Sequence, residues 1–286
     1  MALLEQHGDE ARLLAGGQTL MATLNMRLSE PALLIDLQSV TELKGLQLSG
    51  QQLRIGAMLT HSEIESSALV ALHAPLLAQA APHIAHRAIR NLGTFGGSIA
   101  YGDPAAEWPA CLLALDGVVV VRSVNGERRI AAKDFYTGLY TTTLEPNEMI
   151  VACEIPLAGA GQRFVFDELS RRHGDYAVVG LAASARVKDG LLSQVRLAWL
   201  GTGSMPQRSL AAEKALEGQF FSEAVQSQAL VNLRAELQIE GDLTHSPAAK
   251  QHLVGVMLKR ALQKLCGPAA STNGLHSLAP WGRGLG

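Results

Sequence analysis

The stretch Leu13-Leu14-Ala15-Gly16-Gly17-Gln18-Thr19-Leu20 decides how the N-terminal part of this chain is interpreted. It runs from an apolar segment through a double glycine and a polar pair into residues with helical spacing. Glycine permits a tight turn and close approach of a ligand, and N–H groups at a helix start bind anions. The stretch therefore predicts either a pyrophosphate-binding loop or an ordinary strand-to-helix turn, and alone it favours the turn.

A second glycine-rich stretch, Arg90-Asn91-Leu92-Gly93-Thr94-Phe95-Gly96-Gly97-Ser98, favours a bound ligand more strongly. It contains three glycines, two hydroxyl side chains and an asparagine, without the charge cluster of a solvated surface loop. Two loops of this kind in one domain suit a cofactor with two phosphates. Neither loop matches GxGxxG or the P-loop pattern, so a nicotinamide-binding Rossmann domain is disfavoured.

The remaining sequence predicts an α+β protein with two domains. A run of small residues at 156–161 marks the boundary, which gives domains at 1–158 and 161–266 and a flexible, Gly- and Ser-rich tail at 267–286. Strands are expected at 11–15, 33–37, 46–48, 53–55, 118–121, 150–155, 163–169, 177–187 and 191–200. Helices are expected at 1–7, 19–27, from 60, 68–88, 209–217, 222–237 and 246–266, with a loop at 90–109. Thr60-His61-Ser62-Glu63 resembles a capping box at a helix start, and Asn125-Gly126 predicts a hairpin turn.

Composition excludes several classes of protein. The chain has 286 residues, 48% hydrophobic and 17% charged, with a net charge of -2, which suits a large core and argues against nucleic-acid binding. No apolar run is long enough to span a membrane, and the N-terminus lacks the features of a signal peptide. Cys111, Cys153 and Cys266 are scattered, which predicts a reducing cytoplasm and no iron–sulfur cluster held by this chain alone.

Four motifs together resemble one family. Residues 15–19 and 90–98 resemble the two FAD loops of the medium subunits of molybdenum hydroxylases, which include carbon monoxide dehydrogenase and xanthine dehydrogenase. Asp103-Pro104-Ala105-Ala106-Glu107-Trp108-Pro109 is similar to the acidic motif that follows the second loop, and Ser170-Arg171-Arg172-His173-Gly174-Asp175-Tyr176-Ala177 to the motif that opens the C-terminal domain. Their order and spacing agree over nearly the whole chain.

The resemblance implies a fold and a site. The fold is a FAD-binding domain with a small α/β part and a larger α+β part, then a domain with a three-stranded antiparallel sheet and a helical bundle. The pyrophosphate would be held by Ala15, Gly16, Gly17, Gln18, Thr19, Leu20, Thr94, Phe95, Gly96, Gly97 and Ser98. Asp103 and Glu107 would bind polar parts of FAD, Leu144 would touch the flavin region, and Tyr176 would lie near the isoalloxazine ring.

The resemblance also implies partners and a division of labour. A large subunit with a molybdenum cofactor would hydroxylate the substrate, and a small subunit with two [2Fe–2S] clusters would relay electrons to FAD in this chain. The FAD would pass them to an external acceptor, within a dimer of three-subunit units. No catalytic residue is expected in this chain. The substrate is not indicated, because its pocket would lie in another subunit, and neither is the acceptor.

Two departures from the family pattern stand out. Met1 falls inside the family's first helix, so about one element is expected to be missing, and the small α/β part to be weakened or completed differently. Asp167-Glu168 stands where members often carry a lysine before the Arg-Arg pair, which puts any role of that lysine in tuning the flavin in doubt.

Other candidate sites and functions are weaker. His83 and His86 have the spacing of two metal ligands on a helix, but no third ligand accompanies them, which favours packing or surface histidines. Glu107 and Asp175 could form an acid/base pair, although a flavin electron carrier needs none. Arg171 and Arg172 could be surface charges or face FAD or a partner. A self-contained flavin oxidase or dehydrogenase and a flavin-free docking subunit are the alternative functions.

Overall fold

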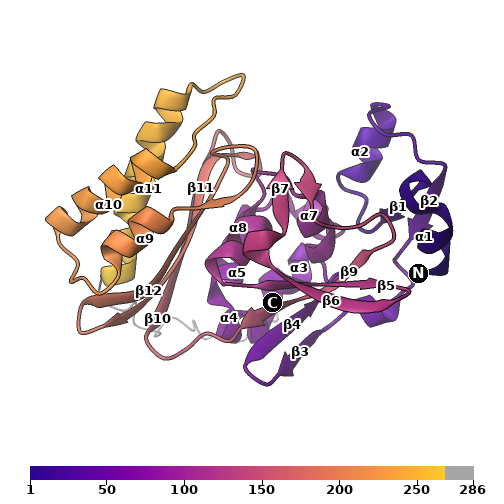
Figure 1. The fold of residues 1–286 in the computed structure, drawn as a ribbon, viewed down its shortest axis with the longest axis horizontal. Coiled ribbons are helices and arrows are strands. Elements are labelled where there is room, and N and C mark those ends of the chain that lie inside the picture. The colour runs from indigo at the N-terminus through magenta and orange to yellow at the C-terminus, as the bar shows by residue number, and fades with distance from the viewer. Residues whose placement is uncertain (268–286) are drawn as a thin grey trace, which may run out of the picture.

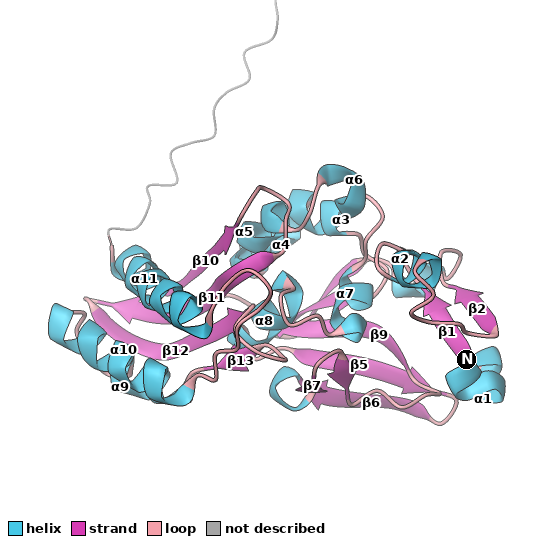
Figure 2. Ribbon diagram, turned by 90° about the horizontal axis from the view of Figure 1, so that it is seen from above, coloured by secondary structure: helices cyan, strands magenta, loops and turns pink. Residues whose placement is uncertain are grey.

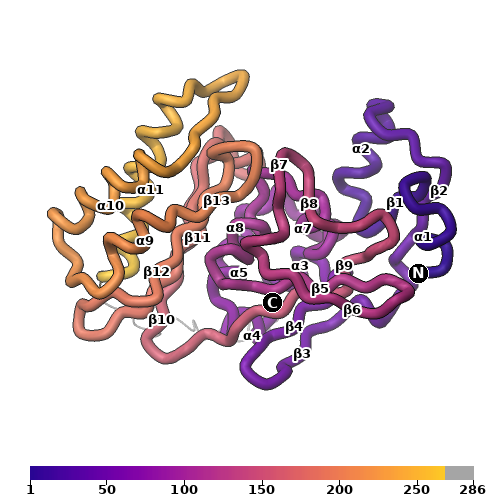
Figure 3. The backbone as a smooth tube through the Cα atoms, in the orientation of Figure 1, coloured from indigo at the N-terminus to yellow at the C-terminus, as the bar shows by residue number. Residues whose placement is uncertain are grey.

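The computed structural model describes residues 1–267 and gives an α+β fold, as expected. The chain runs from a small N-terminal unit through a central sheet covered by helices to a C-terminal sheet with helices (Figures 1 and 3). Within this range no helix combines the length and the apolar character needed to cross a membrane. A flexible tail was expected at 267–286, and its residues from 268 onward lie outside the described part of the chain.

The small unit is a βαβ arrangement. Strands β1 (Ala11–Leu14) and β2 (Leu33–Asp36) pair in parallel, and α2 (Leu20–Asn25) connects them. Helix α1 (Ala2–His7) precedes them, as expected, and ends at Gly8, whose φ is 46°. The 3-10 turns η1 (Gly8–Glu10) and η2 (Thr41–Leu43) flank the unit. Leu4, Ala11 and Leu37 form a core with residues of the central sheet, so the unit packs directly on that sheet.

The central sheet has five antiparallel strands in the order β3-β4-β9-β5-β6. Their bounds are β3 Leu46–Ser49, β4 Gln52–Gly56, β5 Val118–Ser123, β6 Gly126–Ala131 and β9 Met149–Pro156. The hairpin predicted at Asn125-Gly126 is confirmed, with φ 123° at Gly126. Along β5, Val119 and Val121 enter the core under the helices, and Val120 enters the core of the small unit. Because side chains alternate between the two faces of β5, this one strand contributes to both cores and connects the small unit to the helix-covered side of the sheet.

Short helices and one small hairpin complete this part of the chain. They are α3 His61–Ser66, α4 Ala68–His73, α5 Pro75–Ala80, η3 Ala81–His83, α6 Arg87–Arg90, α7 Phe95–Tyr101, α8 Glu107–Ala114, η4 Ala132–Asp134, β7 Tyr136–Gly138 and β8 Thr141–Thr142. Figure 2 shows α3 to α6 clustered beside the end of the C-terminal sheet.

Two expectations for this region are wrong. The long helix expected at 68–88 is divided into α4, α5, η3 and α6, because Pro75 and Pro82 begin new helices and Ala85 has a positive φ of 42°. The loop expected at 90–109 contains α7 and the start of α8, and every residue of α8 is buried. The capping box predicted at Thr60 and Glu63 is confirmed at the start of α3.

The C-terminal domain has the expected antiparallel sheet and helices. Its three long strands are β10 (Gln162–Ser170), β11 (Ala177–Lys188) and β12 (Leu191–Leu200), and the two-residue β13 (Gln207–Arg208) adds a short edge. Helices α9 (Leu210–Leu216), α10 (Glu223–Glu236) and α11 (Pro247–Cys266) cover one face, where Val165, Leu181 and Trp199 are buried. The other face buries Phe166 and Leu200 against the helices of the preceding domain.

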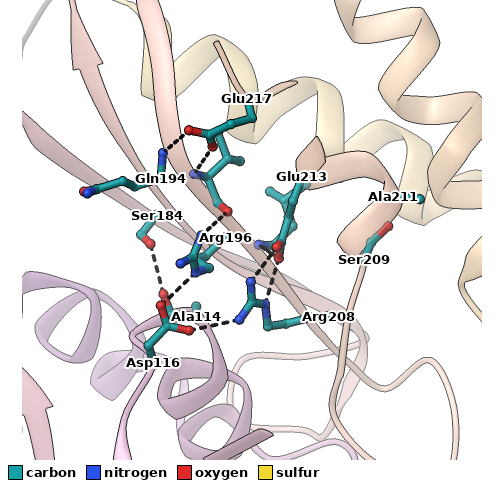
Figure 4. Close-up of polar contacts among 12 residues, drawn as sticks. Ala114, Asp116, Ser184, Gln194, Arg196, Arg208, Ser209, Ala211, Glu213 and Glu217 are labelled. Atoms are coloured by element: carbon teal, nitrogen blue, oxygen red, sulfur yellow. Dashed lines mark hydrogen bonds and ion pairs between the residues drawn. The ribbon is translucent and has the colours of Figure 1, made fainter. Parts of the chain in front are cut away.

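A polar cluster attaches the two domains at the end of α8 (Figure 4). Asp116, with φ 49°, accepts hydrogen bonds from Arg196 Nε at 2.8 Å and from Arg208 Nη1 at 2.9 Å. Arg208 also pairs with Glu213 of α9, and Ser184 Oγ of β11 donates to the carbonyl oxygen of Ala114 at 2.9 Å. These contacts fix the C-terminal sheet against α8, the helix that begins within the acidic motif.

Candidate functional site

The two glycine loops lie in direct contact, although about 75 residues separate them in the sequence. A Cβ on Gly16 would lie 2.1 Å from the carbonyl oxygen of Leu92 and 2.8 Å from Gly93 Cα. A Cβ on Gly97 would lie 3.6 Å from the Cβ of Ala15. The fold therefore brings Ala15 and Gly16 against the second loop, and the binding of one cofactor by residues 15–20 and 94–98 stays a prediction.

The first loop presents free hydrogen-bond donors. Within the described chain, the backbone N–H groups of residues 16–20 have no acceptor, whereas the carbonyls of Gly17 and Thr19 accept from the start of α2. Gly17 has a φ of 70°, a conformation that glycine adopts readily. Residues 15–20 are all partly buried. A run of unpaired N–H groups at a partly buried turn is a concave donor surface suited to phosphate oxygens.

The second loop uses its N–H groups within the fold. Phe95 N–H donates to Leu59 O at 2.8 Å, Gly96 N–H to Ala57 O at 2.8 Å, and Gly97 N–H to Thr94 Oγ1 at 3.2 Å. Ser98 N–H likewise bonds to Thr94 O. The N–H groups of residues 95–98 are therefore occupied within the fold, and this part of the loop can offer its hydroxyl groups and its closeness to the first loop instead.

Phe95 and Gly96 have clear packing roles. The Phe95 ring is fully buried and lies edge-on to the ring of Trp108, with centroids 5.4 Å apart. A Cβ on Gly96 would lie 2.5 Å from the Cβ of Ala57, so only glycine lets α7 approach the end of β4 this closely. Their assignment to the cofactor remains a prediction from the resemblance.

A buried histidine under the second loop was missed by the sequence analysis. His61 Nδ1 accepts a hydrogen bond from Trp108 Nε1 at 3.0 Å. Burial, followed by the charge of Arg90, lowers the pKa of His61 to about 4, so the ring is neutral at ordinary pH. A Cβ on Gly93 would meet His61 Nε2 at 2.7 Å, which places the loop backbone directly on the ring. The only local indication of His61 in the sequence was its position between Thr60 and Glu63 of the capping box.

The acidic motif lies in a poorly solvated region. Asp103 is buried and accepts a hydrogen bond from Ala105 N–H at 2.8 Å, and burial raises its pKa. Glu107 begins α8 and is also buried. Burial, then Glu168, then Asp103 raise the pKa of Glu107 to about 8, although its own backbone N–H opposes this shift. A carboxyl with such a pKa is mostly protonated at neutral pH and can donate as well as accept a hydrogen bond.

Tyr176 is near this acidic region and is 70% exposed. Partial burial, followed by the charge of Asp103, raises its pKa to about 12. Two tyrosines that the sequence analysis did not consider lie in the same electrostatic environment. Tyr101 and Tyr140 have ring centroids 5.0 Å apart, and Tyr140 has a φ of 52°. Tyr140 is exposed and Tyr101 is partly buried, and the charges of both also raise the pKa of Tyr176. Leu144 is partly buried and packs against the main core.

The remaining candidate residues are dispersed. His83 lies in η3 and faces Glu168, whereas His86 is exposed and its ring lies against Gly174. No group of three potential metal ligands occurs among residues 1–267. Arg171 and Arg172 are exposed and form no ion pair within this range.

Comparison with known proteins identifies the chain's family. Residues 1–158 match the family model described as the FAD binding domain in molybdopterin dehydrogenase. Residues 164–265 match the CO dehydrogenase flavoprotein C-terminal domain. The chain is 39% identical over 254 residues to the nicotine 6-hydroxylase medium subunit of Paenarthrobacter nicotinovorans, covering 89% of each chain. It is 36% identical to the carbon monoxide dehydrogenase medium chain of Hydrogenophaga pseudoflava, covering 92% of this chain and 91% of the relative.

A solved structure agrees with these sequence matches. A chain of carbon monoxide dehydrogenase from Hydrogenophaga pseudoflava, in a form that lacks the Mo-pyranopterin moiety, is similar with a TM-score of 0.90 and 37% identity. The similarity covers 92% of each chain. The chain therefore belongs to the family of FAD-binding medium subunits of molybdenum hydroxylases, of the carbon monoxide dehydrogenase and xanthine dehydrogenase type.

Proposed function

We propose that this chain holds FAD at the two glycine loops, takes electrons from the [2Fe–2S] clusters of a small subunit and passes them to an external acceptor. The run of unpaired N–H groups at residues 16–20, packed against the second loop, carries the proposal. These groups can bind the pyrophosphate without breaking any bond of the fold. FAD itself would supply the exchange between one-electron and two-electron transfer.

Each residue group at the site has a separate proposed role. Residues 15–20 bind the pyrophosphate through the backbone, and Thr94 and Ser98 add hydroxyl groups. Asp103 and Glu107 bind polar parts of the cofactor from a poorly solvated position, where their hydrogen bonds are strengthened. Tyr176 lies beside the ring, with Leu144 in the flavin region. Residues 1–158 and 161–266 act as the two domains.

The partners follow from the relatives, which are named as medium subunits or chains. We propose a large subunit that carries the molybdenum cofactor and hydroxylates the substrate, and a dimer of three-subunit units in the cytoplasm. The two relatives named above differ in what their names say they act on, nicotine and carbon monoxide. This difference supports placing substrate choice in another subunit.

The test is the flavin content of the purified, assembled complex. Denaturation followed by chromatography of the released flavin should give one FAD per copy of this chain. FMN, which lacks the pyrophosphate, or the absence of flavin from an active complex would contradict the proposal. Iron and molybdenum should copurify only with the partner subunits. Stoichiometric iron in the chain purified alone would refute the division of labour.

A further inference from the structure

The second glycine loop is attached along the segment that connects β4 to α3. Three backbone hydrogen bonds, between 2.8 and 3.0 Å long, join residues 57–61 to residues 93–96. Thr60 and Thr94 form an antiparallel bridge within this contact. The capping box of Thr60 and Glu63 fixes the start of α3 on the other side. The position of the loop therefore depends on the residues that begin α3.

The His61 side chain occupies the space that Gly93 leaves open. A Cβ on Gly93 would lie 2.7 Å from Nε2 and 2.9 Å from Cδ2 of His61, and the next atom is the carbonyl oxygen of Ile89 at 3.2 Å. His61 is buried, so its ring has little freedom to move away. The backbone of the loop thus packs directly on this ring, and any rotation of the ring would displace Gly93.

A hydrogen bond from Trp108 holds the His61 ring in one orientation. Trp108 Nε1–H can only donate, so His61 Nδ1, 3.0 Å away, must accept and carries no proton. A neutral ring then has its proton on Nε2, the ring atom closest to the position of a Gly93 Cβ. The two ring centroids are 5.9 Å apart, and Trp108 is fully buried. This one bond therefore sets both the orientation and the tautomer of His61.

The same bond reaches the acidic motif. Trp108 follows Glu107 at the start of α8, and its ring also lies edge-on to Phe95 of the second loop. An apolar side chain at position 61 can fill a core, but it cannot form a directional contact with the indole N–H. A buried polar pair costs desolvation and, when satisfied, favours one arrangement of its neighbours. His61 and Trp108 therefore connect the second loop to the acidic motif through a contact with a defined direction.

We infer that the hydrogen bond between His61 and Trp108 positions the second glycine loop and the acidic motif for binding FAD. The inference rests on the proposed function, because it assigns positioning residues to that same cofactor site. Neither His61 nor Trp108 has to touch FAD. Loss of the bond leaves a buried polar atom without a partner and frees the ring that supports Gly93. The affinity for FAD should therefore depend on this bond more than on the packing of the surrounding core.

Substitutions at both ends of the bond test the inference in the full chain. His61→Leu removes the acceptor and Trp108→Phe removes the donor, and each should raise the Kd for FAD about tenfold. His61→Asn is the conservative variant, because the Asn Oδ1 can accept from the indole in place of Nδ1, and its Kd should stay close to the wild-type value. Leu76→Ala is the matched control. It removes buried apolar atoms from the same core, so it should lower the thermal unfolding temperature without changing the Kd.

Two measurements on the flavin-free chain separate this inference from the proposed function. NMR of the imidazole nitrogens should show the Nε2–H tautomer of His61 in the wild type. Hydrogen exchange at the Phe95 and Gly96 amides should accelerate about tenfold in His61→Leu and Trp108→Phe, but not in His61→Asn. A wild type that gives both results and binds no FAD supports the positioning of the loop and refutes the proposed function. A wild type that binds FAD, with a Kd unchanged in His61→Leu and Trp108→Phe or raised equally in Leu76→Ala, overturns the inference alone.

Discussion

Replacing Gly16 with alanine tests whether contact between the two loops is needed to bind FAD. The added Cβ would lie 2.1 Å from the carbonyl oxygen of Leu92 and 2.8 Å from both Leu92 C and Gly93 Cα. All three neighbours are backbone atoms, so no side chain can rotate away. The loops would have to separate by roughly 1 Å in an interior that is otherwise closely packed.

The cost of this separation falls mainly on the cofactor site. Overpacking of this kind costs about 1–3 kcal/mol when the backbone must shift. The small unit that carries Gly16 packs on the central sheet through its own core, so the rest of the chain should remain folded. The phosphate-binding N–H groups move with the loop, and we expect the Kd for FAD to rise at least about tenfold, or 1.4 kcal/mol.

The assay compares flavin content and FAD titration in wild type, Gly16→Ala and a matched glycine control. Gly159→Ala serves as the control, because the nearest atom to its added Cβ is Gln162 Oε1 at 3.9 Å. Circular dichroism and thermal unfolding of all three chains check the fold. If Gly16→Ala binds FAD with wild-type affinity, close contact of the loops is not part of the site and the reasoning is refuted.

Three further substitutions test neighbouring parts of the structure. Gly97→Val would place a Cβ 2.7 Å from Thr94 Oγ1, the atom that caps α7. The flavin content should fall while the C-terminal domain stays folded, and full flavin occupancy would mean that the second loop has only a structural role. Tyr176→Ala should retain FAD but alter its reoxidation by external acceptors in stopped-flow measurements, with less effect on its reduction; unchanged reoxidation would remove Tyr176 from the flavin site. Asp116→Asn should lower the free energy of unfolding by no more than about 1 kcal/mol per lost ion pair, because this carboxylate is 48% exposed. A much larger loss in a denaturant titration would contradict this prediction.

The sequence by itself determined the features that depend on neighbouring residues. The Thr60–Glu63 capping box and the Asn125-Gly126 turn formed as predicted, because the side chains and backbone angles involved lie within four residues. The order of the glycine loops and acidic motifs also indicated the family correctly. Such motifs combine several constraints in a fixed order, so together they are far more specific than a single Gly-Gly turn.

Local patterns failed where distant contacts decide the outcome. The glycine content of residues 90–109 predicted a loop, but α7 forms there because Thr94 caps it and Gly96 fits against Ala57. The single helix predicted from the apolar run at 68–88 failed for a different, local reason, because Pro75 and Pro82 divide it. The prolines were visible in the sequence, whereas the packing of Gly96 required the position of a residue about 40 places away.

Only the tertiary structure decided which backbone N–H groups at the site remain available to bind a ligand. Among residues 1–267, the N–H groups of residues 16–20 have no acceptor, whereas those of residues 95–98 are used by the fold. The tertiary structure also placed His61 against Trp108, 47 residues away, and buried the Glu168 side chain beside His83 rather than in solvent. The physical reason is that strand register and helix packing, not residue type, determine the face a side chain occupies and the partners it meets.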